Sequence, residues 1–165
     1  GVSQSHEGIS INEKMIPLVK REPELIHGIR NIVHNALKFS KSHVDINLIT
    51  NSTKINLEIT DDGKGFPNDI TNMIGEPFLK KSNFYLMEVK NRRSEEGMGL
   101  GLFIANILLE KTNGRLKFSN MKQIENDGKK RITGAKVEIS WERPSIEVLL
   151  SDKKAKMKEN PRNVS

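Results

Sequence analysis

The apolar positions of this chain repeat with two periods, and each change of period marks the boundary of an element. From Pro23 to Phe39 they recur every three or four residues, which predicts an amphipathic helix with proline in its first turn. Successive residues turn by about 100° around a helix, so the apolar and polar positions separate. One side carries Leu25, Ile29, Ile32 and Ala36, and the opposite side carries His27, Asn31, Asn35 and Lys38.

Strict alternation of apolar and polar residues follows this helix and predicts a β-hairpin. Residues 44–48 and 55–59 alternate on either side of the turn-forming triplet 51–53. A second helix is predicted from Leu100 to Lys111 and ends before Asn113-Gly114. Because it is apolar nearly all round, we expect it to be buried.

Two closing strands are predicted after the second helix, at 116–120 and 135–141, joined by a polar loop at 121–134. A short strand is predicted at 15–19 and a short helix at 68–73. Residues 79–97 carry many charges without a clear period, and an irregular stretch of this length inside a compact domain indicates a functional lid. The tail after Pro144 is expected to be mobile.

The length and composition indicate one globular domain. The chain has 165 residues, of which 35% are hydrophobic and 29% charged. No run has the length of a membrane span, and residues 1–20 lack the layout of a signal peptide. The absence of cysteine excludes disulfides and thiolate metal sites, and it agrees with a reducing cytoplasm.

The net charge of +6 would favour nucleic acid or anionic lipid as a partner, but the excess is unevenly placed. Residues 152–165 hold five basic and two acidic residues, a balance of +3. Residues 80–96 hold five basic and three acidic residues, a balance of +2. Since a tail and a loop account for most of the charge, a nucleic-acid module is not favoured.

Asn31 and Asn35 stand four residues apart, so their amides project from adjacent turns of one helix face. Magnesium prefers oxygen ligands and usually keeps waters and phosphate oxygens beside few protein ligands. Amide carbonyls suit that role. Taken alone, however, this helix is better explained by a solvated polar stripe opposite the core.

Asp61 ends the second strand and is followed by Gly63 and Gly65. A carboxylate there can accept a hydrogen bond from the adenine amine, which a guanine carbonyl cannot donate. The glycines permit positive φ and close backbone approach. An ordinary tight turn explains this motif equally well, because Asp and Gly are favoured in turns.

Gly97, Gly99 and Gly101 lead into the second helix, where free backbone amides can bind an anion. A packing or hinge role is the alternative, although each glycine has a cost in backbone entropy. Together the three motifs supply what a magnesium nucleotide requires. They offer an oxygen ligand for the metal, an acceptor for the adenine amine, and bare backbone around phosphate.

Other ligand motifs do not fit. Residues 75–82 approach a P-loop but lack its second glycine, and Leu102 stands where a dinucleotide fingerprint requires glycine. The four histidines show no zinc-ligand spacing, and no serine or cysteine nucleophile motif is present.

Four segments, in this order, resemble the signature boxes of the ATP-binding catalytic domain of sensor histidine kinases, within the gyrase–Hsp90–kinase–MutL ATPase superfamily. NIVHNALKFS is similar to the N-box, DDGKGF to the first glycine box, EPF (Glu76 to Phe78) to the F-box, and GMGLGLFIA to the second glycine box. The resemblance covers about Pro23 to Trp141. Its EPF and EGMGLGLFIANILLEKTNG stretches are most similar to the redox-responsive RegB/PrrB-type kinases.

The resemblance implies a Bergerat-type α/β (α+β) two-layer sandwich, with a mixed sheet backed by helices and ATP held under a flexible lid. It implies that Asn35 coordinates magnesium with Asn31 assisting, and that Asp61 accepts the adenine amine. Lys80 or Lys81 would reach the γ-phosphate. The implied ATP contacts are Asn31, Asn35, Lys38, Asp61, Gly63, Gly65, Phe78, Lys80, Lys81, Gly97, Met98, Gly99, Leu100 and Gly101.

Two positions depart from the family pattern, and one motif is missing. His34 stands where these kinases often carry an acidic residue, so no base role is carried over to it. Asn31 stands where the gyrase and Hsp90 branch has its water-activating glutamate, so vigorous ATP hydrolysis is not expected. His6-Glu7 is followed by Gly8-Ile9-Ser10, which does not match the phosphoacceptor motif. The chain is therefore expected to be an excised catalytic domain.

The expected organisation is a linker at 1–22, an ATP-binding kinase domain at 23–143 and a basic tail at 144–165. The implied activity transfers the γ-phosphoryl of Mg-ATP to a histidine on a separate dimerisation domain of the same parent, which feeds a response regulator. The domain would be cytoplasmic, on a parent that an inner membrane can anchor. A non-catalytic nucleotide-gated module and an anti-sigma-factor-type serine kinase of the same fold remain alternatives.

Overall fold

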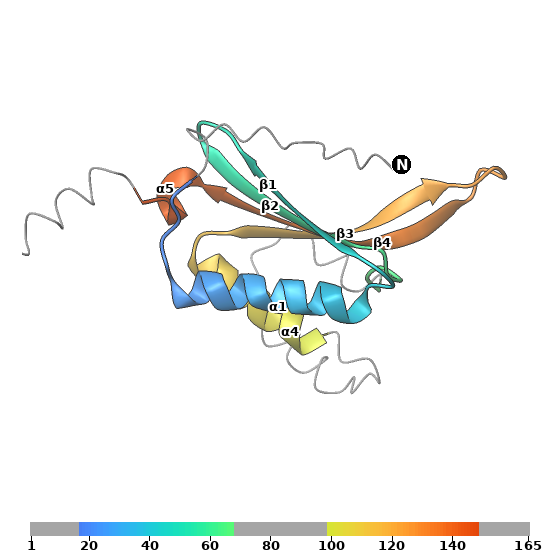
Figure 1. Cartoon of the computed structure of the whole chain (residues 1–165), viewed down its shortest axis with the longest axis horizontal. Helices are drawn as coiled ribbons and strands as arrows, with labels where there is room; N and C mark the ends of the chain where they lie inside the picture. The colour runs from blue at the N-terminus through green and yellow to red at the C-terminus, as the bar shows by residue number, and fades with distance from the viewer. Residues whose placement is uncertain (1–16, 68–98, 149–165) are drawn as a thin grey trace, which may run out of the picture.

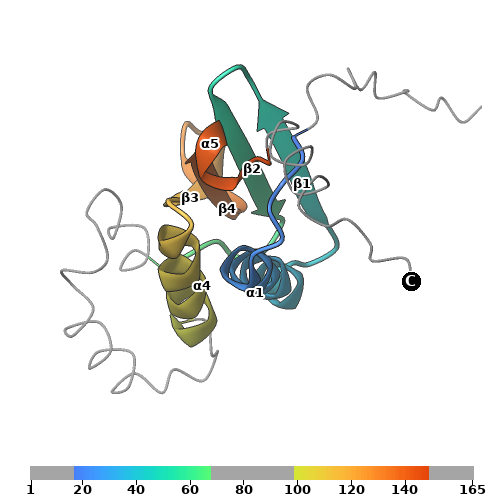
Figure 2. The ribbon, with the colours of Figure 1, turned by 90° about the vertical axis from the view of Figure 1, so that its left-hand side faces the viewer.

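The structure is a computed structural model that describes residues 17–67 and 99–148 (Figure 1). Four strands form one sheet in the order β1-β2-β4-β3, and the helices α1 and α4 lie side by side against one face of it (Figure 2). The predicted two-layer α/β sandwich is therefore confirmed. The elements, in chain order, are α1 (Pro23–Phe39), β1 (Val44–Thr50), β2 (Lys54–Asp61), α4 (Gly99–Lys111), β3 (Arg115–Ile124), β4 (Lys130–Glu142) and α5 (Arg143–Ile146).

All strand pairs within the described part of the chain are antiparallel, whereas the resemblance implies a mixed sheet. For two of the three pairs the physical reason is the short connection, because β1–β2 and β3–β4 are hairpins and a hairpin pairs its strands antiparallel. The turn of the first hairpin is closed by Asn51, whose Oδ1 accepts the backbone N–H groups of Thr53 (2.9 Å) and Lys54 (2.8 Å). The predicted hairpin is confirmed.

Helix α1 has the bounds that the sequence predicts. Pro23 occupies its first turn, and Lys38 in the last turn complements the negative end of the helix dipole. The helix packs against α4 at Gly28, where an added Cβ would lie 2.5 Å from the Leu109 Cγ. Glycine at this position therefore lets the two helices approach closely.

Helix α4 begins one residue before the predicted start and ends as expected, with Asn113 at φ 60°. The residue after the helix is anchored, since the Thr112 hydroxyl donates to the Leu109 carbonyl and accepts the Trp141 indole N–H at 2.9 Å. Trp141 is itself buried. The prediction of burial holds for most of α4 but not for Ile104, which is 40% exposed.

The second hairpin is longer than the sequence predicts, and the predicted strand bounds 116–120 and 135–141 are wrong. β3 continues to Ile124 and β4 begins at Lys130, so the predicted loop shrinks to residues 125–129. This outer part projects beyond the helices (Figure 1) and is mostly exposed. Only backbone pairing holds these two strand segments together, and neither of their faces is buried. Their sequence therefore shows no alternation of apolar and polar residues.

The two ends of the described chain lie together. Val19 pairs with Glu147 in an isolated bridge, and the Val148 N–H donates to the Leu18 carbonyl at 2.6 Å. Ile146 is buried. The expected mobile tail therefore does not begin at Pro144, because the folded body continues to Val148. Neither α1, α4 nor α5 has the length and apolarity that crossing a lipid bilayer requires.

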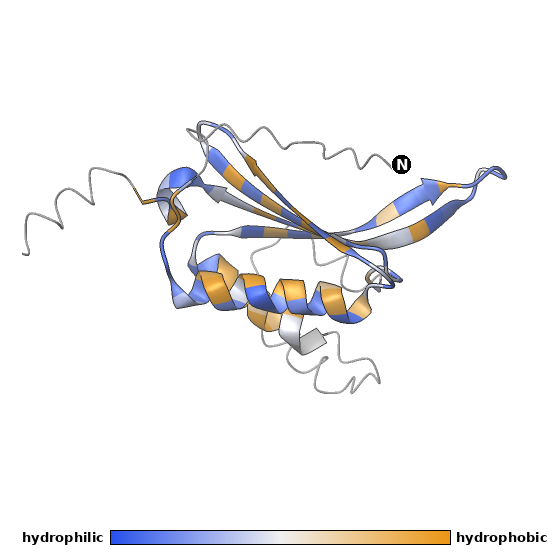
Figure 3. Ribbon diagram, in the orientation of Figure 1, coloured by the Kyte–Doolittle hydropathy of each residue, from blue (hydrophilic) through white to orange (hydrophobic). Residues whose placement is uncertain are grey.

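The inner faces of the layers supply the core. Polar and apolar residues are interspersed along the hairpins and α1, as the hydropathy colouring shows (Figure 3). The predicted helix at 68–73 and the predicted lid at 79–97 lie outside the described residues. Among the described residues, the buried apolar side chains that form one core cluster are Leu25, Ile32, Ala36, Ile55, Leu57, Ile59, Phe66, Leu102, Ala105, Leu109, Phe118, Ala135, Val137, Ile139, Trp141 and Ile146.

Candidate nucleotide-binding site

Asp61 is buried at the end of β2, and its two carboxylate oxygens have different surroundings. Its Oδ1 accepts the N–H of Gly63 at 2.8 Å and the N–H of Ala135, on β4, at 3.4 Å. Within residues 17–67 and 99–148, no donor contacts its Oδ2. The turn and β4 therefore fix the carboxylate and leave one oxygen for a ligand.

The two glycines of this turn are required by contacts with the protein itself. A Cβ on Gly63 would lie 2.2 Å from the Phe39 carbonyl oxygen, at the end of α1. Gly65 has φ +81°, and a Cβ there would lie 2.6 Å from the Ile132 Cγ2. Packing thus explains both glycines, and it places the turn between the end of α1 and the β3–β4 hairpin.

Sequence reasoning missed two residues that hold the turn. A Cβ on Gly134 would lie 1.8 Å from the Asp61 carbonyl oxygen, so only glycine fits where β4 passes this turn. Asn120 accepts the Phe66 N–H at 2.6 Å and donates to the Phe66 carbonyl at 2.9 Å. A glycine inside a strand is a sign of close backbone approach, but the predicted strand began after Gly134.

Both carboxylate oxygens of Asp62, the residue after Asp61, accept hydrogen bonds from the loop between α1 and β1. It accepts the Ser42 hydroxyl together with the backbone N–H groups of Lys41 (2.8 Å), Ser42 (3.0 Å) and His43 (3.3 Å). The Ser42 hydroxyl is the largest of the causes that hold the pKa of Asp62 well below its usual range. Asp62 therefore fixes the loop, and of the two neighbouring carboxylates only Asp61 keeps an uncontacted oxygen.

Asn31 and Asn35 are half-buried, so the solvated polar stripe expected on α1 is wrong for this pair. Seven residues separate Gly28 from Asn35, which places them within about 20° of each other around the helix. The asparagines therefore lie beside the face that contacts α4. In the described part of the chain no hydrogen bond engages either amide, in contrast to the amide of Asn120.

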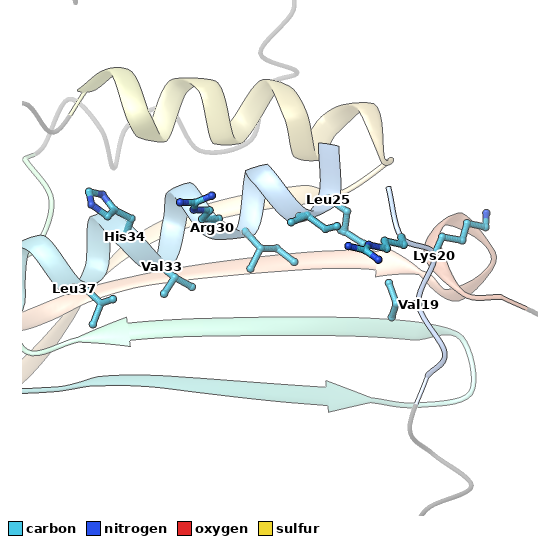
Figure 4. Close-up of a pocket in the computed structure, with 10 residues that line it drawn as sticks. Val19, Lys20, Leu25, Arg30, Val33, His34 and Leu37 are labelled. Carbon is cyan, nitrogen blue, oxygen red and sulfur yellow. The ribbon is translucent and has the colours of Figure 1, made fainter. Parts of the chain in front are cut away.

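The start of α4 lies beside the C-terminal half of α1, because the two helices run antiparallel (Figures 1 and 4). Gly28 of α1 lies against Leu109 of α4. Counting seven residues forward from Gly28 and seven residues back from Leu109 therefore places Asn35 and Leu102 at the same level of the two helices. The first backbone N–H groups of a helix have no partner within it. A Cβ on Gly101 would meet no described atom within 4 Å, so packing among these residues does not explain that glycine.

The structure brings the three sequence motifs together at one end of the molecule. Gly63 contacts Phe39 at the end of α1, Asn35 precedes it by one turn, and the first turn of α4, with Gly99, Leu100 and Gly101, lies alongside. Lys38 is exposed on the last turn of α1, with its ammonium 5.1 Å from the Phe39 ring centroid. Phe78, Lys80, Lys81, Gly97 and Met98 lie outside the described residues.

Comparison with known families identifies this arrangement. Residues 20–145 match the family described as histidine kinase-, DNA gyrase B- and HSP90-like ATPase. The chain belongs to this family. The family therefore covers all described elements from α1 to β4.

The relatives of this ATPase domain include sensor histidine kinases. It is 40% identical over 128 residues to the sensor histidine kinase RegB of Cereibacter sphaeroides, covering 76% of this chain and 27% of RegB. It is 34% identical over 98 residues to the histidine protein kinase SaeS of Staphylococcus aureus, covering 56% of this chain and 26% of SaeS. The domain thus spans about a quarter of the length of these relatives.

A solved structure has the same fold. The mycobacterial sensor histidine kinase MprB matches with a TM-score of 0.54 at 22% identity, covering 80% of this chain and 76% of that chain. At this identity the match concerns the fold of the ATPase domain. The resemblance to RegB-type kinases found in the sequence is confirmed by the RegB match.

Proposed function

We propose that this ATPase domain binds Mg-ATP at the C-terminal end of α1 and acts as the catalytic domain of a sensor histidine kinase. One observation carries the proposal, which is the convergence of Asp61, the Asn31–Asn35 pair and the start of α4 at one place. The kinase names of the relatives support it.

The proposed adenine contact is the Asp61 Oδ2. This oxygen lies on a buried carboxylate whose other oxygen is already bonded to Gly63 and Ala135, so its direction is fixed before a ligand arrives. A carboxylate accepts hydrogen bonds only. It therefore favours the adenine amine and disfavours a guanine carbonyl at the same position.

The proposed metal ligand is the Asn35 amide oxygen, with Asn31 assisting. Two neighbouring amides without partners in the described residues fit a hard oxygen-seeking ion. Among these residues, no group of three histidine or acidic side chains has an arrangement that could hold a metal ion. Bound magnesium would neutralise charge on the β- and γ-phosphates. The amides at the start of α4 and Lys38 would hold the phosphate oxygens from the protein side.

The proposed reaction uses a histidine that the family motif does not locate in this chain. A nitrogen of that histidine, on a dimerisation domain of the same parent, would attack the γ-phosphorus and ADP would leave. Phosphoryl transfer depends mainly on alignment and charge neutralisation, so acceptor and ATP site can lie on separate domains. A response regulator would then receive the phosphoryl group.

The test is transfer of γ-labelled phosphate from ATP to the histidine-bearing domain of the parent. We expect slow hydrolysis by this chain alone, and magnesium-dependent label on the partner that acid washing removes, because phosphohistidine is acid-labile. Acid-stable label would indicate a serine kinase. Tight ATP binding with no transfer to the cognate domain would indicate a non-catalytic nucleotide-gated module.

A further inference from the structure

Asn120 is a polar residue on the core face of β3. Side chains two residues apart in a strand lie on the same face, and Leu116 and Phe118, which precede Asn120 at this spacing, both pack in the core. The Phe118 ring meets the buried Phe66 ring edge-on, with the two centroids 5.6 Å apart. An amide beside these rings requires hydrogen-bond partners, because burial of unpaired polar groups is costly.

The Asn120 amide finds both partners on one residue of the Asp61 turn. Its Oδ1 accepts the Phe66 N–H at 2.6 Å, and its Nδ2 donates to the Phe66 carbonyl at 2.9 Å. Two residues that face each other in an antiparallel ladder can exchange such a pair of bonds, so the side chain takes the place of a strand beside Phe66. A Cβ on Gly65 would lie 2.7 Å from the same Oδ1. The amide therefore lies directly against the turn.

One register pair of the β3–β4 ladder holds both ends of this turn. Asn120 faces Ala135 across the ladder. The Ala135 N–H donates to the Asp61 Oδ1 at 3.4 Å, while Asn120 holds Phe66. This register pair thus fixes the separation between the Asp61 carboxylate and the backbone that follows the two glycines of the turn.

We propose that Asn120 is a positioning residue for adenine recognition at the proposed nucleotide site. The inference rests on the proposed function, in which the Asp61 Oδ2 accepts the adenine amine. A base that reaches this oxygen lies beside the turn, so it fits only while Phe66 and Asp61 keep their separation. Asn120 acts through the backbone of Phe66 rather than by touching the base. Recognition of this kind requires supporting hydrogen bonds that hold the contacting groups to within about 0.5 Å.

A purely structural role for Asn120 predicts a different result. An amide that only satisfies two backbone groups stabilises the fold, and its loss lowers the free energy of unfolding and weakens the binding of all purine nucleotides alike. A positioning role weakens the binding of adenine selectively. The reason is that the proposed metal and phosphate contacts lie on α1 and α4, which this register pair does not hold.

The test compares ATP with inosine triphosphate, in which a carbonyl replaces the adenine amine. Calorimetry with magnesium should show that wild-type protein binds ATP roughly thirtyfold more tightly than inosine triphosphate. Asn120→Ala should reduce this ratio at least about fivefold and change the affinity for inosine triphosphate by less than about twofold. The matched control is Asn126→Ala, at an exposed asparagine in the connection of the same hairpin, which should keep the wild-type ratio.

A second variant, Asn120→Asp, removes only the donating half of the amide. Its carboxylate can still accept the Phe66 N–H but cannot donate to the Phe66 carbonyl, and it repels that oxygen. We expect the preference for ATP over inosine triphosphate to fall in this variant as well. Because the two side chains have the same shape, this variant decides the question if Asn120→Ala does not fold.

A wild-type preference for ATP that persists in either folded variant at position 120 would overturn the proposal, even if the variant unfolds at a lower urea concentration. An equal loss of affinity for both nucleotides would overturn it too, since that result indicates a purely structural role. Wild-type protein that binds the two nucleotides equally would instead remove the Asp61 contact from the proposed function, and the role of Asn120 with it.

Discussion

The two ends of the proposed nucleotide site are built differently. At the Asp61 turn, protein atoms occupy the space around Gly63, Gly65 and Gly134 so closely that a Cβ on any of them would lie within 3 Å of another group. On α1, by contrast, Asn31 and Asn35 are half-buried with no partner in the described residues. Among the described residues, folding alone therefore completes the contacts of the proposed adenine end, whereas the two amides of the proposed metal end stay available for a ligand.

This difference separates two kinds of experiment. Substitutions in the turn should mainly change the free energy of unfolding, because they disturb contacts that exist without nucleotide. Substitutions at the metal end should appear mainly in nucleotide affinity. Asp61 connects the two regimes, since one of its oxygens belongs to the fold and the other is proposed to belong to the ligand.

The largest effect is expected from Gly134→Ala. The Cβ of the alanine would lie 1.8 Å from the Asp61 carbonyl oxygen. Residues 134 and 61 belong to β4 and β2, which are paired with each other. Overpacking of this kind should lower the free energy of unfolding by about 3 kcal/mol or more, measured by urea denaturation. The control is Gly128→Ala in the same hairpin, where φ is +79° but space is open, with an expected loss of about 1 kcal/mol. Equal losses would contradict the close contact.

Asp61→Asn should reduce ATP affinity strongly and leave the fold intact. The amide oxygen can still accept the Gly63 N–H, while the NH₂ group replaces the proposed adenine acceptor. Loss of one hydrogen bond to a charged group corresponds to about 2 kcal/mol, or roughly thirtyfold in affinity, measured by calorimetry. Wild-type protein that binds GTP as tightly as ATP would remove Asp61 from the base contact.

Asn35→Ala should abolish the gain in ATP-analogue affinity that magnesium gives, which we expect to be about tenfold, or 1.4 kcal/mol. The free energy of unfolding should change by less than about 0.5 kcal/mol, because no hydrogen bond in the described residues is lost. Calorimetry with and without magnesium measures the first quantity, and Asn47→Ala on the exposed strand β1 is the control. An undiminished magnesium response would exclude Asn35 as the metal ligand.

Gly101→Ala should raise the free energy of unfolding by about 0.5 kcal/mol, because alanine favours helix and no described atom lies within 4 Å of the new Cβ. We expect ATP affinity to fall a few-fold, since the side chain would crowd the amides at the start of α4. Thermal unfolding and calorimetry measure the two effects. A loss of stability would show that packing, rather than a ligand, requires this glycine.

Asp62→Asn should have the smallest effect on nucleotide affinity, and its effect on stability is distinctive in its pH dependence. The folded state holds the pKa of Asp62 below its usual range, so the ionised carboxylate stabilises the fold above the unfolded-state value of about 3.9. That contribution is lost as the pH falls from there toward the folded-state pKa. The advantage of wild type over the variant should thus be constant near neutrality and shrink in acid, as urea denaturation at each pH would show.

The sequence predicts well those elements whose pattern reflects burial. α1 has the expected bounds and the first hairpin the expected place, because one face of α1 and the inner face of β2 are covered; both strands of the hairpin are a few residues longer than the alternating positions. The outer β3–β4 hairpin was underestimated because it has no covered face, so pairing alone determines its length. Local periodicity contains no information about pairing between residues of this kind.

The candidate site could be assembled from motifs, but its supports could not. Asn120 holds Phe66 from 54 positions away, and Gly134 fits against Asp61 from another strand. The Asn120 contact has no local sequence signal, and the signal of Gly134, a glycine inside a strand, was missed because the predicted strand began after it. The side of α1 on which Asn35 lies was misjudged because Gly28, which has no side chain, contributes nothing to an apolar pattern and yet marks the contact with α4.

Trp141 is the only tryptophan in the chain, and its indole N–H is bonded to Thr112 just after α4. Selectively excited fluorescence of the protein therefore originates from one position, where the end of α4 meets β4. The opposite end of the same helix lies at the proposed phosphate site. Any displacement of α4 along its axis during nucleotide titration changes the surroundings of this single fluorophore, so its emission follows the helix in real time without an attached dye.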